Sequence, residues 1–256
     1  MNRLVLFDID CTLIDAHGAG GRAIMRAIKE VYGVEGELGG YSFHGRTDPG
    51  IVRDLADLWG AGDSESAVGR YEGETQPQVV HDLAAALGTP DDAIDALVDA
   101  CVARYVELLA AEVEVGQIEL LPGIKELVTA LAADRRVLVG LLTGNVEAGA
   151  RIKLEPTGLY PLFKVAAFGS DSAFRPELPA CAVARAEALT GHHYVGKEIV
   201  IIGDTPADVA CGAGLGVKTI AVATGRHGLE DLAAHRPDFL FSDFSDWRVV
   251  FEAILA

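Results

Sequence analysis

Two aspartates, Asp8 and Asp10, stand at the end of the first apolar run of the chain and could act as acid, base or nucleophile. The run before them, residues 4–7, is short, apolar and rich in β-forming residues, which predicts a buried strand of a parallel sheet. The carboxyl ends of such strands are where α/β proteins hold their ligands. Two carboxylates this close can take different roles in one reaction, because one can attack or hold a metal while the other carries a proton.

Two further segments carry groups that suit an anion. Thr143, Gly144 and Asn145 follow the apolar run 139–142 at the start of a helical pattern, so a hydroxyl and free backbone N–H groups could meet an anion there. The same residue types also make ordinary helix caps. Arg175 stands just before a proline at another helix start, where it could neutralise a phosphate and brace the nucleophile, or simply lie at the surface.

A second pair of acids, Asp204 and Asp208, follows the apolar run 199–202 and lies about one helical turn apart. Together with Asp8 and Asp10 they would gather four carboxylates at one edge of a sheet. Such a cluster is strongly repulsive unless a cation sits within it. Mg²⁺ is suited to this position, since it binds one or two carboxylates together with waters and substrate phosphate.

The elements that must position these residues change in kind along the chain. Between residues 16 and 117 the apolar residues recur at three and four positions, which predicts helices over residues 20–31, 49–59, 64–87 and 90–115. After residue 121 helical and strand patterns alternate. Helices are expected over residues 124–133, 146–155, 177–189 and 207–215, and strands over residues 137–142, 165–168, 198–202, 217–222 and 239–241.

This alternation predicts an α/β protein with right-handed βαβ units. We expect a Rossmann-like three-layer α/β/α core with a parallel sheet, built from residues 1–15 and 118–256. Residues 16–117 would form an all-helical cap domain inserted after the first strand, over the carboxyl edge of the sheet. The glycine-rich residues 18–21 would be the flexible join through which the cap opens.

Composition narrows the classes of function. The 256 residues carry a formal net charge of −17, and the pI near 4.7 leaves no basic field for nucleic acid or an anionic membrane surface. No segment is long and apolar enough to span a bilayer, and no signal-peptide pattern is found, so a cytoplasmic location is expected. The four scattered cysteines are expected to be reduced and mostly buried, without a zinc or disulfide role.

Taken in order, the motifs Asp-x-Asp-x-Thr, Thr-Gly-Asn, a basic residue before proline, and Gly-Asp-Thr-x-x-Asp resemble those of the haloacid dehalogenase-like hydrolase superfamily. The similarity is to its phosphoglycolate phosphatase-like branch with a helical cap, and it covers nearly the whole chain. It implies a Mg²⁺-dependent phosphatase that hydrolyses a small phosphate monoester through an aspartyl-phosphate intermediate. The expected partner is thus a small phosphorylated metabolite.

The resemblance also implies a role for each motif residue. Asp8 would be the nucleophile, and Asp10 would protonate the leaving alcohol and then activate water. Thr143, with the backbone of Gly144 or Asn145, would hold the phosphate oxygens, and Arg175 would take the role usually played by lysine. The metal would be bound by Asp8, the main-chain carbonyl of Asp10, Asp204 and, in support, Asp208. Cys11 departs from the family pattern, since glycine is usual at that position.

Two alternatives share these motifs. A phosphosugar mutase would pass the phosphoryl group to a second sugar hydroxyl, whereas a phosphatase passes it to water. A non-catalytic phosphate- or Mg²⁺-binding module would have no need for both Asp8 and Asp10. In the expected cap, Arg46 lies in the polar segment 43–48 and could face the substrate, although this segment could equally be a solvated loop.

Overall fold

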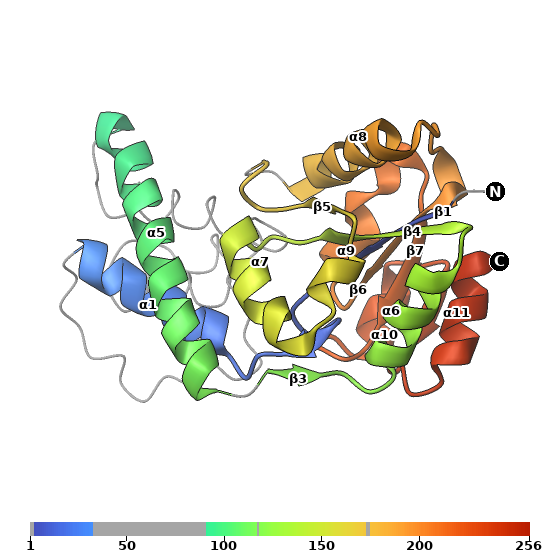
Figure 1. Ribbon diagram of the computed structural model, residues 1–256, viewed down its shortest axis with the longest axis horizontal. Coiled ribbons are helices and arrows are strands. Elements are labelled where there is room, and N and C mark those ends of the chain that lie inside the picture. Colours follow the sequence, from blue (N-terminus) through green and yellow to red (C-terminus); the bar gives the residue numbers. More distant parts are fainter. Residues whose placement is uncertain (1–2, 33–90, 117, 173–174) are drawn as a thin grey trace.

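The computed structural model describes residues 3–32, 91–116, 118–172 and 175–256. Its centre is a parallel sheet with the strand order β5-β4-β1-β6-β7-β8 (Figure 1). The strands are β1 (Arg3–Phe7), β4 (Val137–Leu142), β5 (Val165–Ala167), β6 (Ile199–Gly203), β7 (Lys218–Val222) and β8 (Phe239–Phe241). The first strand of the chain is therefore central, which explains why all five of its residues are buried.

Helices cover both faces of this sheet (Figure 1). They are α6 (Ile124–Ala133), α7 (Glu147–Leu154), α8 (Leu178–Thr190), α9 (Pro206–Cys211), α10 (Leu229–Ala234) and α11 (Trp247–Leu255). Leu4 and Leu6 pack with α8 and α9 on one face, whereas Val5 and Phe7 pack with α6 and α11 on the other. This alternation along one strand is the period of two that a sheet imposes. The predicted three-layer α/β/α fold is confirmed.

Several predicted boundaries differ from those observed. The helix expected over residues 207–215 ends at Cys211, and a separate 3-10 turn covers Ala213–Leu215. Glycines at positions 212, 214 and 216 account for the break, since glycine favours helix ends over helix interiors. The helices α10 and α11 were not predicted. The remaining 3-10 turns are Glu155–Thr157, Tyr160–Leu162, Arg175–Glu177 and Gly196–Glu198.

Two long helices, α1 (Ala19–Tyr32) and α5 (Asp91–Val115), pack against each other beside the sheet domain (Figure 1). A two-stranded antiparallel sheet of β2 (Ile14–Asp15) and β3 (Glu119–Leu120) brings the chain out to them and back. The helices expected over residues 49–59 and 64–87 lie outside the described residues. The division at residues 16 and 117 into core and cap therefore stays a prediction.

Strand register brings the carboxyl ends of three strands to one edge. Phe7 of β1 pairs with Leu141 of β4 and with Ile202 of β6. The chain leaves the sheet directly after these positions, so Asp8, Thr143 and Asp204 start from neighbouring points.

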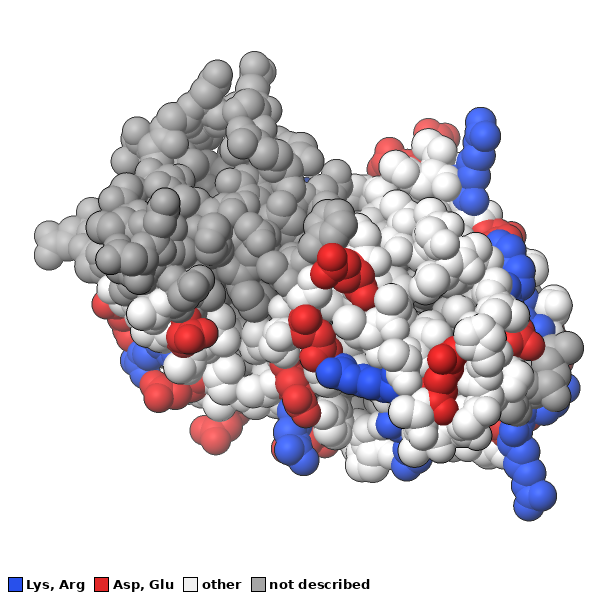
Figure 2. All heavy atoms as spheres, turned by 90° about the horizontal axis from the view of Figure 1, so that it is seen from above, with Lys and Arg blue, Asp and Glu red and all other residues white. Residues whose placement is uncertain are grey.

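On the face drawn in Figure 2, acidic and basic side chains are interspersed over the described part. None of the described helices is long and apolar enough to cross a membrane.

Candidate active site

Three buried carboxylates, those of Asp8, Asp204 and Asp208, meet at the carboxyl edge of the sheet. Each offers one oxygen, and these three oxygens lie within 4.8 Å of one another. Asp8 comes from the end of β1, Asp204 from the end of β6, and Asp208 from the first turn of α9. Burial, and then repulsion from Asp208, raises the pKa of Asp8 to about 7. The same two causes raise the pKa of Asp204 well above its usual range.

Arg175 is the cation that stands among these acids. It enters from the 3-10 turn before α8, and its Nη2 donates to Asp208 Oδ1 at 2.5 Å and lies 3.4 Å from Asp8 Oδ1. Burial opposes the charge on the guanidinium, but the attraction of Asp208 and Asp8 outweighs it and raises the pKa of Arg175. The arginine Nε is buried without a hydrogen-bond partner among the described residues.

Local backbone structure holds the two later acids in place. Thr205 is the N-cap of α9, and its backbone N–H and hydroxyl both donate to Asp208 Oδ2, at 3.0 and 2.6 Å. Asp204 accepts a hydrogen bond from the Thr12 hydroxyl at 3.1 Å. A Cβ atom at Gly225, in the loop after β7, would lie only 1.9 Å from Asp204 Oδ2. Gly225 is thus required for this carboxylate to lie where it does, although no sequence motif indicated it.

The donor set fits a hard divalent cation. Three carboxylate oxygens this close are repulsive, and one arginine shared by two of them balances only part of the charge. Oxygen donors of this kind at such separations are the ligands that Mg²⁺ and similar ions take in proteins. Asp8, Asp204 and Asp208 could therefore bind a metal. The Asp10 side chain is not among these three, and metal binding by the Asp10 main-chain carbonyl stays a prediction.

A metal-binding prediction follows from the raised pKa values. A carboxyl whose pKa is raised on folding stabilises the fold fully below its ordinary value of 3.8, and this contribution is lost as pH rises through about 7. A divalent cation binds the ionised form, so it should stabilise the protein more at pH 8 than at pH 5. We expect saturating Mg²⁺ to raise Tm by roughly 5–10 °C at pH 8 in thermal denaturation.

The control for this prediction is Asp204→Asn, which should lose most of the Mg²⁺-dependent rise in Tm. Asp134→Asn should keep it, because Asp134 pairs with Arg136 before the amino end of β4, at the opposite edge of the sheet. Equal stabilisation by Mg²⁺ at the two pH values would contradict binding at these acids.

The Asp10 carboxylate is held apart from the three acids by a second set of contacts. Lys153 Nζ donates to both of its oxygens, at 2.8 and 2.7 Å, and Asn145 Nδ2 donates to Oδ2 at 2.8 Å. Asn145 also donates through Nδ2 to the buried Thr143 hydroxyl at 2.8 Å. The side-chain amide of Asn145 therefore bridges Thr143 and Asp10. The backbone N–H of Asn145 also donates to the Thr143 hydroxyl oxygen, at 3.3 Å, so both the side chain and the backbone of Asn145 hold this arrangement together.

Sequence reasoning missed Lys153, although its helix carried a signal. Positions 149, 150, 153 and 154 of α7 are its buried residues, and this spacing marks one face of a helix. A lysine on such a face is unusual, because lysine is almost never fully buried unless it is paired. Arg46, the residue predicted in the cap, lies outside the described residues.

A family model described as haloacid dehalogenase-like hydrolase matches residues 2–216. The chain belongs to this family. It is also 31% identical over 252 residues to a phosphoglycolate phosphatase of Rhodospirillum rubrum, which covers 96% of this chain and 91% of the relative. Family membership and this relative together support a phosphatase enzyme.

Solved structures agree with this fold. A predicted phosphatase from Clostridium acetobutylicum matches with a TM-score of 0.65 and 15% identity, over 100% of this chain and 99% of the other. CbbY from Rhodobacter sphaeroides in complex with phosphate matches with a TM-score of 0.64 and 20% identity, over 96% of each chain. At these identities the likeness establishes the fold alone.

Two residues of this hydrolase depart from the family pattern, Cys11 in place of glycine and Arg175 in place of lysine, and the structure shows how each is accommodated. Cys11 takes a left-handed backbone conformation with φ of 58°, which costs a non-glycine residue about 1–2 kcal/mol. The Thr224 hydroxyl donates to the Cys11 carbonyl at 2.5 Å and stabilises this turn. Burial raises the pKa of the Cys11 thiol, so it is protonated at neutral pH. Arg175 contacts both Asp208 and Asp8 through the same nitrogen, Nη2, and so places its positive charge between two acids.

Proposed function

We propose that this chain is a Mg²⁺-dependent phosphatase that hydrolyses a small phosphate monoester through an aspartyl-phosphate intermediate. The observation that carries the proposal is the buried cluster of Asp8, Asp204 and Asp208 around Arg175 at the carboxyl edge of the sheet. Membership of the hydrolase family adds support. Phosphoryl transfer depends on charge neutralisation and in-line positioning, and this cluster suits both.

In the first step, Asp8 attacks phosphorus and the bond from phosphorus to the ester oxygen breaks, while Asp10 gives its proton to the leaving alcohol. In the second step, water attacks the phosphorus of the aspartyl phosphate, Asp10 takes a proton from that water, and inorganic phosphate leaves with Asp8 restored. A Mg²⁺ ion held by Asp8, Asp204, Asp208 and the Asp10 main-chain carbonyl would neutralise charge on the phosphoryl group.

Two groups are available for the phosphate oxygens. The Thr143 hydroxyl oxygen accepts hydrogen bonds from Asn145. The proton of this hydroxyl has no acceptor among the described residues, so the Thr143 O–H can donate to phosphate. The Nε of Arg175 is a buried donor without a partner among the described residues. A buried unpaired donor is costly, and a phosphate oxygen would satisfy it. The backbone N–H of Gly144 would complete the phosphate site just before α7, whereas that of Asn145 donates to the Thr143 hydroxyl oxygen.

The name of the Rhodospirillum rubrum relative makes phosphoglycolate the first ester to test. We expect chelator-treated protein to release little phosphate from a panel of small esters, and added Mg²⁺ to restore release by at least about 10²-fold. The panel would include phosphoglycolate, hexose phosphates and an aryl phosphate, with inorganic phosphate measured directly. Asp134→Asn serves as a control that should keep the wild-type rate.

Other outcomes distinguish the alternatives. A full rate after chelation would reject the metal requirement. Isomerised sugar phosphate without released phosphate would indicate a mutase, because the phosphoryl group would then have passed to a second hydroxyl. Binding of phosphate and Mg²⁺ without turnover of any ester would indicate a non-catalytic module.

A further inference from the structure

The buried Lys153 side chain is the feature of this site that the mechanism above does not use. Its side chain is only 2% exposed, whereas that of its partner Asp10 is 39% exposed. The carboxylate therefore keeps an open side, and the ammonium contacts it from the protein interior. Lys153 Nζ also donates to Asn145 Oδ1 at 2.8 Å, so within the described residues the ammonium contacts oxygens of both Asp10 and Asn145.

Asn145 closes this set of contacts. It accepts from Lys153 through Oδ1 and donates through Nδ2 to Asp10, so the three side chains contact one another in a ring. The ring is tied to β4 by the bond from Asn145 to the Thr143 hydroxyl. Such a ring leaves the Asp10 carboxylate little rotational freedom. Burying a lysine is costly even when it is paired, so a packing role alone is a poor reason to place one here.

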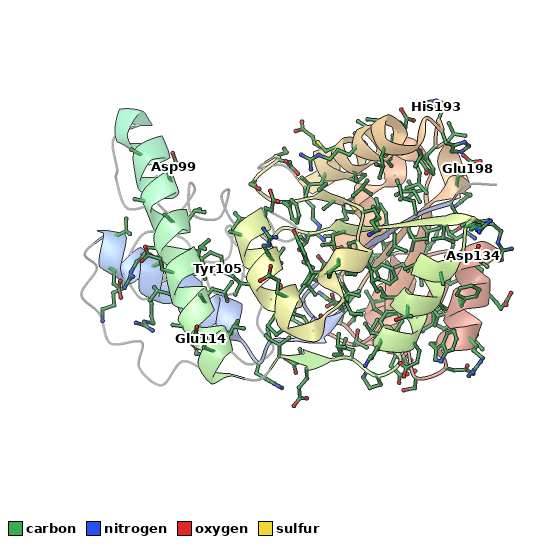
Figure 3. The ribbon with its side chains drawn as sticks, viewed as in Figure 1. Asp99, Tyr105, Glu114, Asp134, His193 and Glu198 are labelled. Carbon is green, nitrogen blue, oxygen red and sulfur yellow. The ribbon has the colours of Figure 1, made fainter. Side chains whose placement is uncertain are left out.

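Residues of α1 and α5 limit the space around the ammonium. A Cβ atom at Gly20, in the first turn of α1, would lie 3.1 Å from Lys153 Nζ and 3.8 Å from the Tyr105 hydroxyl oxygen. Tyr105 is fully buried and extends from α5 toward α7, where its ring would meet a Cβ atom at Gly149 at 3.3 Å (Figure 3). The position of the ammonium is thus set by both α7 and the α1–α5 pair.

We propose that Lys153 is a positioning residue, which holds the Asp10 carboxylate in the orientation needed for proton transfer. The proposal rests on the proposed role of Asp10 as the acid and base of a phosphatase. Lys153 touches neither metal nor phosphate in this scheme, and it acts only through Asp10. Its loss should therefore slow the proton-dependent step and spare substrate and metal binding.

The test is Lys153→Met, which removes the ammonium and keeps a similar length. A misplacement of about 1 Å can cost a reacting group 10²-fold in rate. We therefore expect phosphorylation by an alkyl phosphate to slow by about 10²-fold in rapid-quench measurements. An aryl phosphate, whose leaving group needs little protonation, should lose less than about tenfold. KM and the Mg²⁺ concentration for half-maximal activity should stay within about threefold of wild type.

Lys218→Met is the matched control. Lys218 is also a buried lysine, but its Nζ donates to the carbonyls of Ala253 and Ile254 at the end of α11. It lies at the amino end of β7, at the opposite edge of the sheet from the site. Its loss should lower Tm and leave both esters at the wild-type rate, which separates loss of a buried ammonium from loss of Asp10 positioning.

Asp10→Asn distinguishes failure of this inference from failure of the proposed function. With Asp10 replaced, Lys153→Met should cause almost no further loss on the alkyl ester, because the two residues act as one unit. If Asp10→Asn itself turns over the alkyl ester at the wild-type rate, the proposed acid–base role fails. Suppose instead that Asp10→Asn hydrolyses the alkyl ester slowly. If Lys153→Met then lowers the rates on the alkyl and aryl esters by the same factor, or lowers neither rate, only the positioning role of Lys153 is rejected.

Gly20→Ala provides a second test that keeps the ammonium. Alanine has a higher helix propensity than glycine, so this variant should fold even if Lys153→Met does not. Its methyl group would displace Lys153 Nζ by a few tenths of an ångström. We expect a roughly threefold to tenfold loss on the alkyl ester and a smaller loss on the aryl ester. An unchanged ratio of the two rates would contradict the proposal.

Discussion

Replacement of Asp8 by asparagine is expected to abolish turnover while the protein stays folded. The amide cannot form an aspartyl phosphate, and loss of a covalent nucleophile elsewhere has cost about 10⁶-fold. The fold should tolerate the change because burial makes an ionised Asp8 costly, as its raised pKa of about 7 indicates. Asparagine has the same shape and no charge. The measurement is phosphate release together with acid-quenched phosphoenzyme, which should be absent from the variant.

Circular dichroism and Tm at pH 8 supply the check on folding. We expect a Tm equal to that of the metal-free wild-type protein or higher, since the uncharged side chain removes repulsion within the acid cluster. Asp134→Asn should form phosphoenzyme at the wild-type rate, because its carboxylate pairs with Arg136 outside the site. A folded Asp8→Asn protein that still hydrolysed esters would assign the nucleophile to another residue.

Replacement of Asp10 by alanine or asparagine is expected to produce a loss that depends on the leaving group. General acid catalysis contributes about 10²–10⁴-fold, and an alkoxide needs that proton far more than an activated phenolate does. Phosphorylation by an alkyl phosphate should therefore fall by this factor, and phosphorylation by an aryl phosphate should fall much less. Each factor of ten corresponds to about 1.4 kcal/mol of transition-state stabilisation.

Rapid-quench measurement of phosphoenzyme is needed for the Asp10 variants. Asp10 is also expected to activate water in the second step, so steady-state rates on both esters would fall when dephosphorylation becomes slow. Resolving the first step removes this complication. Equal losses on alkyl and aryl esters in that step would show that Asp10 only orders the loop or the metal, and the general-acid role would be withdrawn.

Local pattern was enough to predict the sheet and the acids at its edge. The apolar run ending at Phe7 predicted a buried strand, and β1 is one of the two middle strands of the sheet. Parallel strands linked by helices all place their carboxyl ends on one side. Asp8, Thr143 and Asp204 could therefore be expected near one another from their positions after three apolar runs, without knowledge of any contact.

Tertiary structure decided which groups contact which. The sequence predicted Asp10 and Asn145 as site residues but not that Lys153, 143 residues beyond Asp10, would hold the Asp10 carboxylate. It gave no sign that Gly225 must lack a side chain for Asp204 to lie where it does. Both depend on distances between segments remote in the chain. Periodicity within one segment indicates which face is buried, but the partner that a buried side chain meets there is set only by how the segments pack.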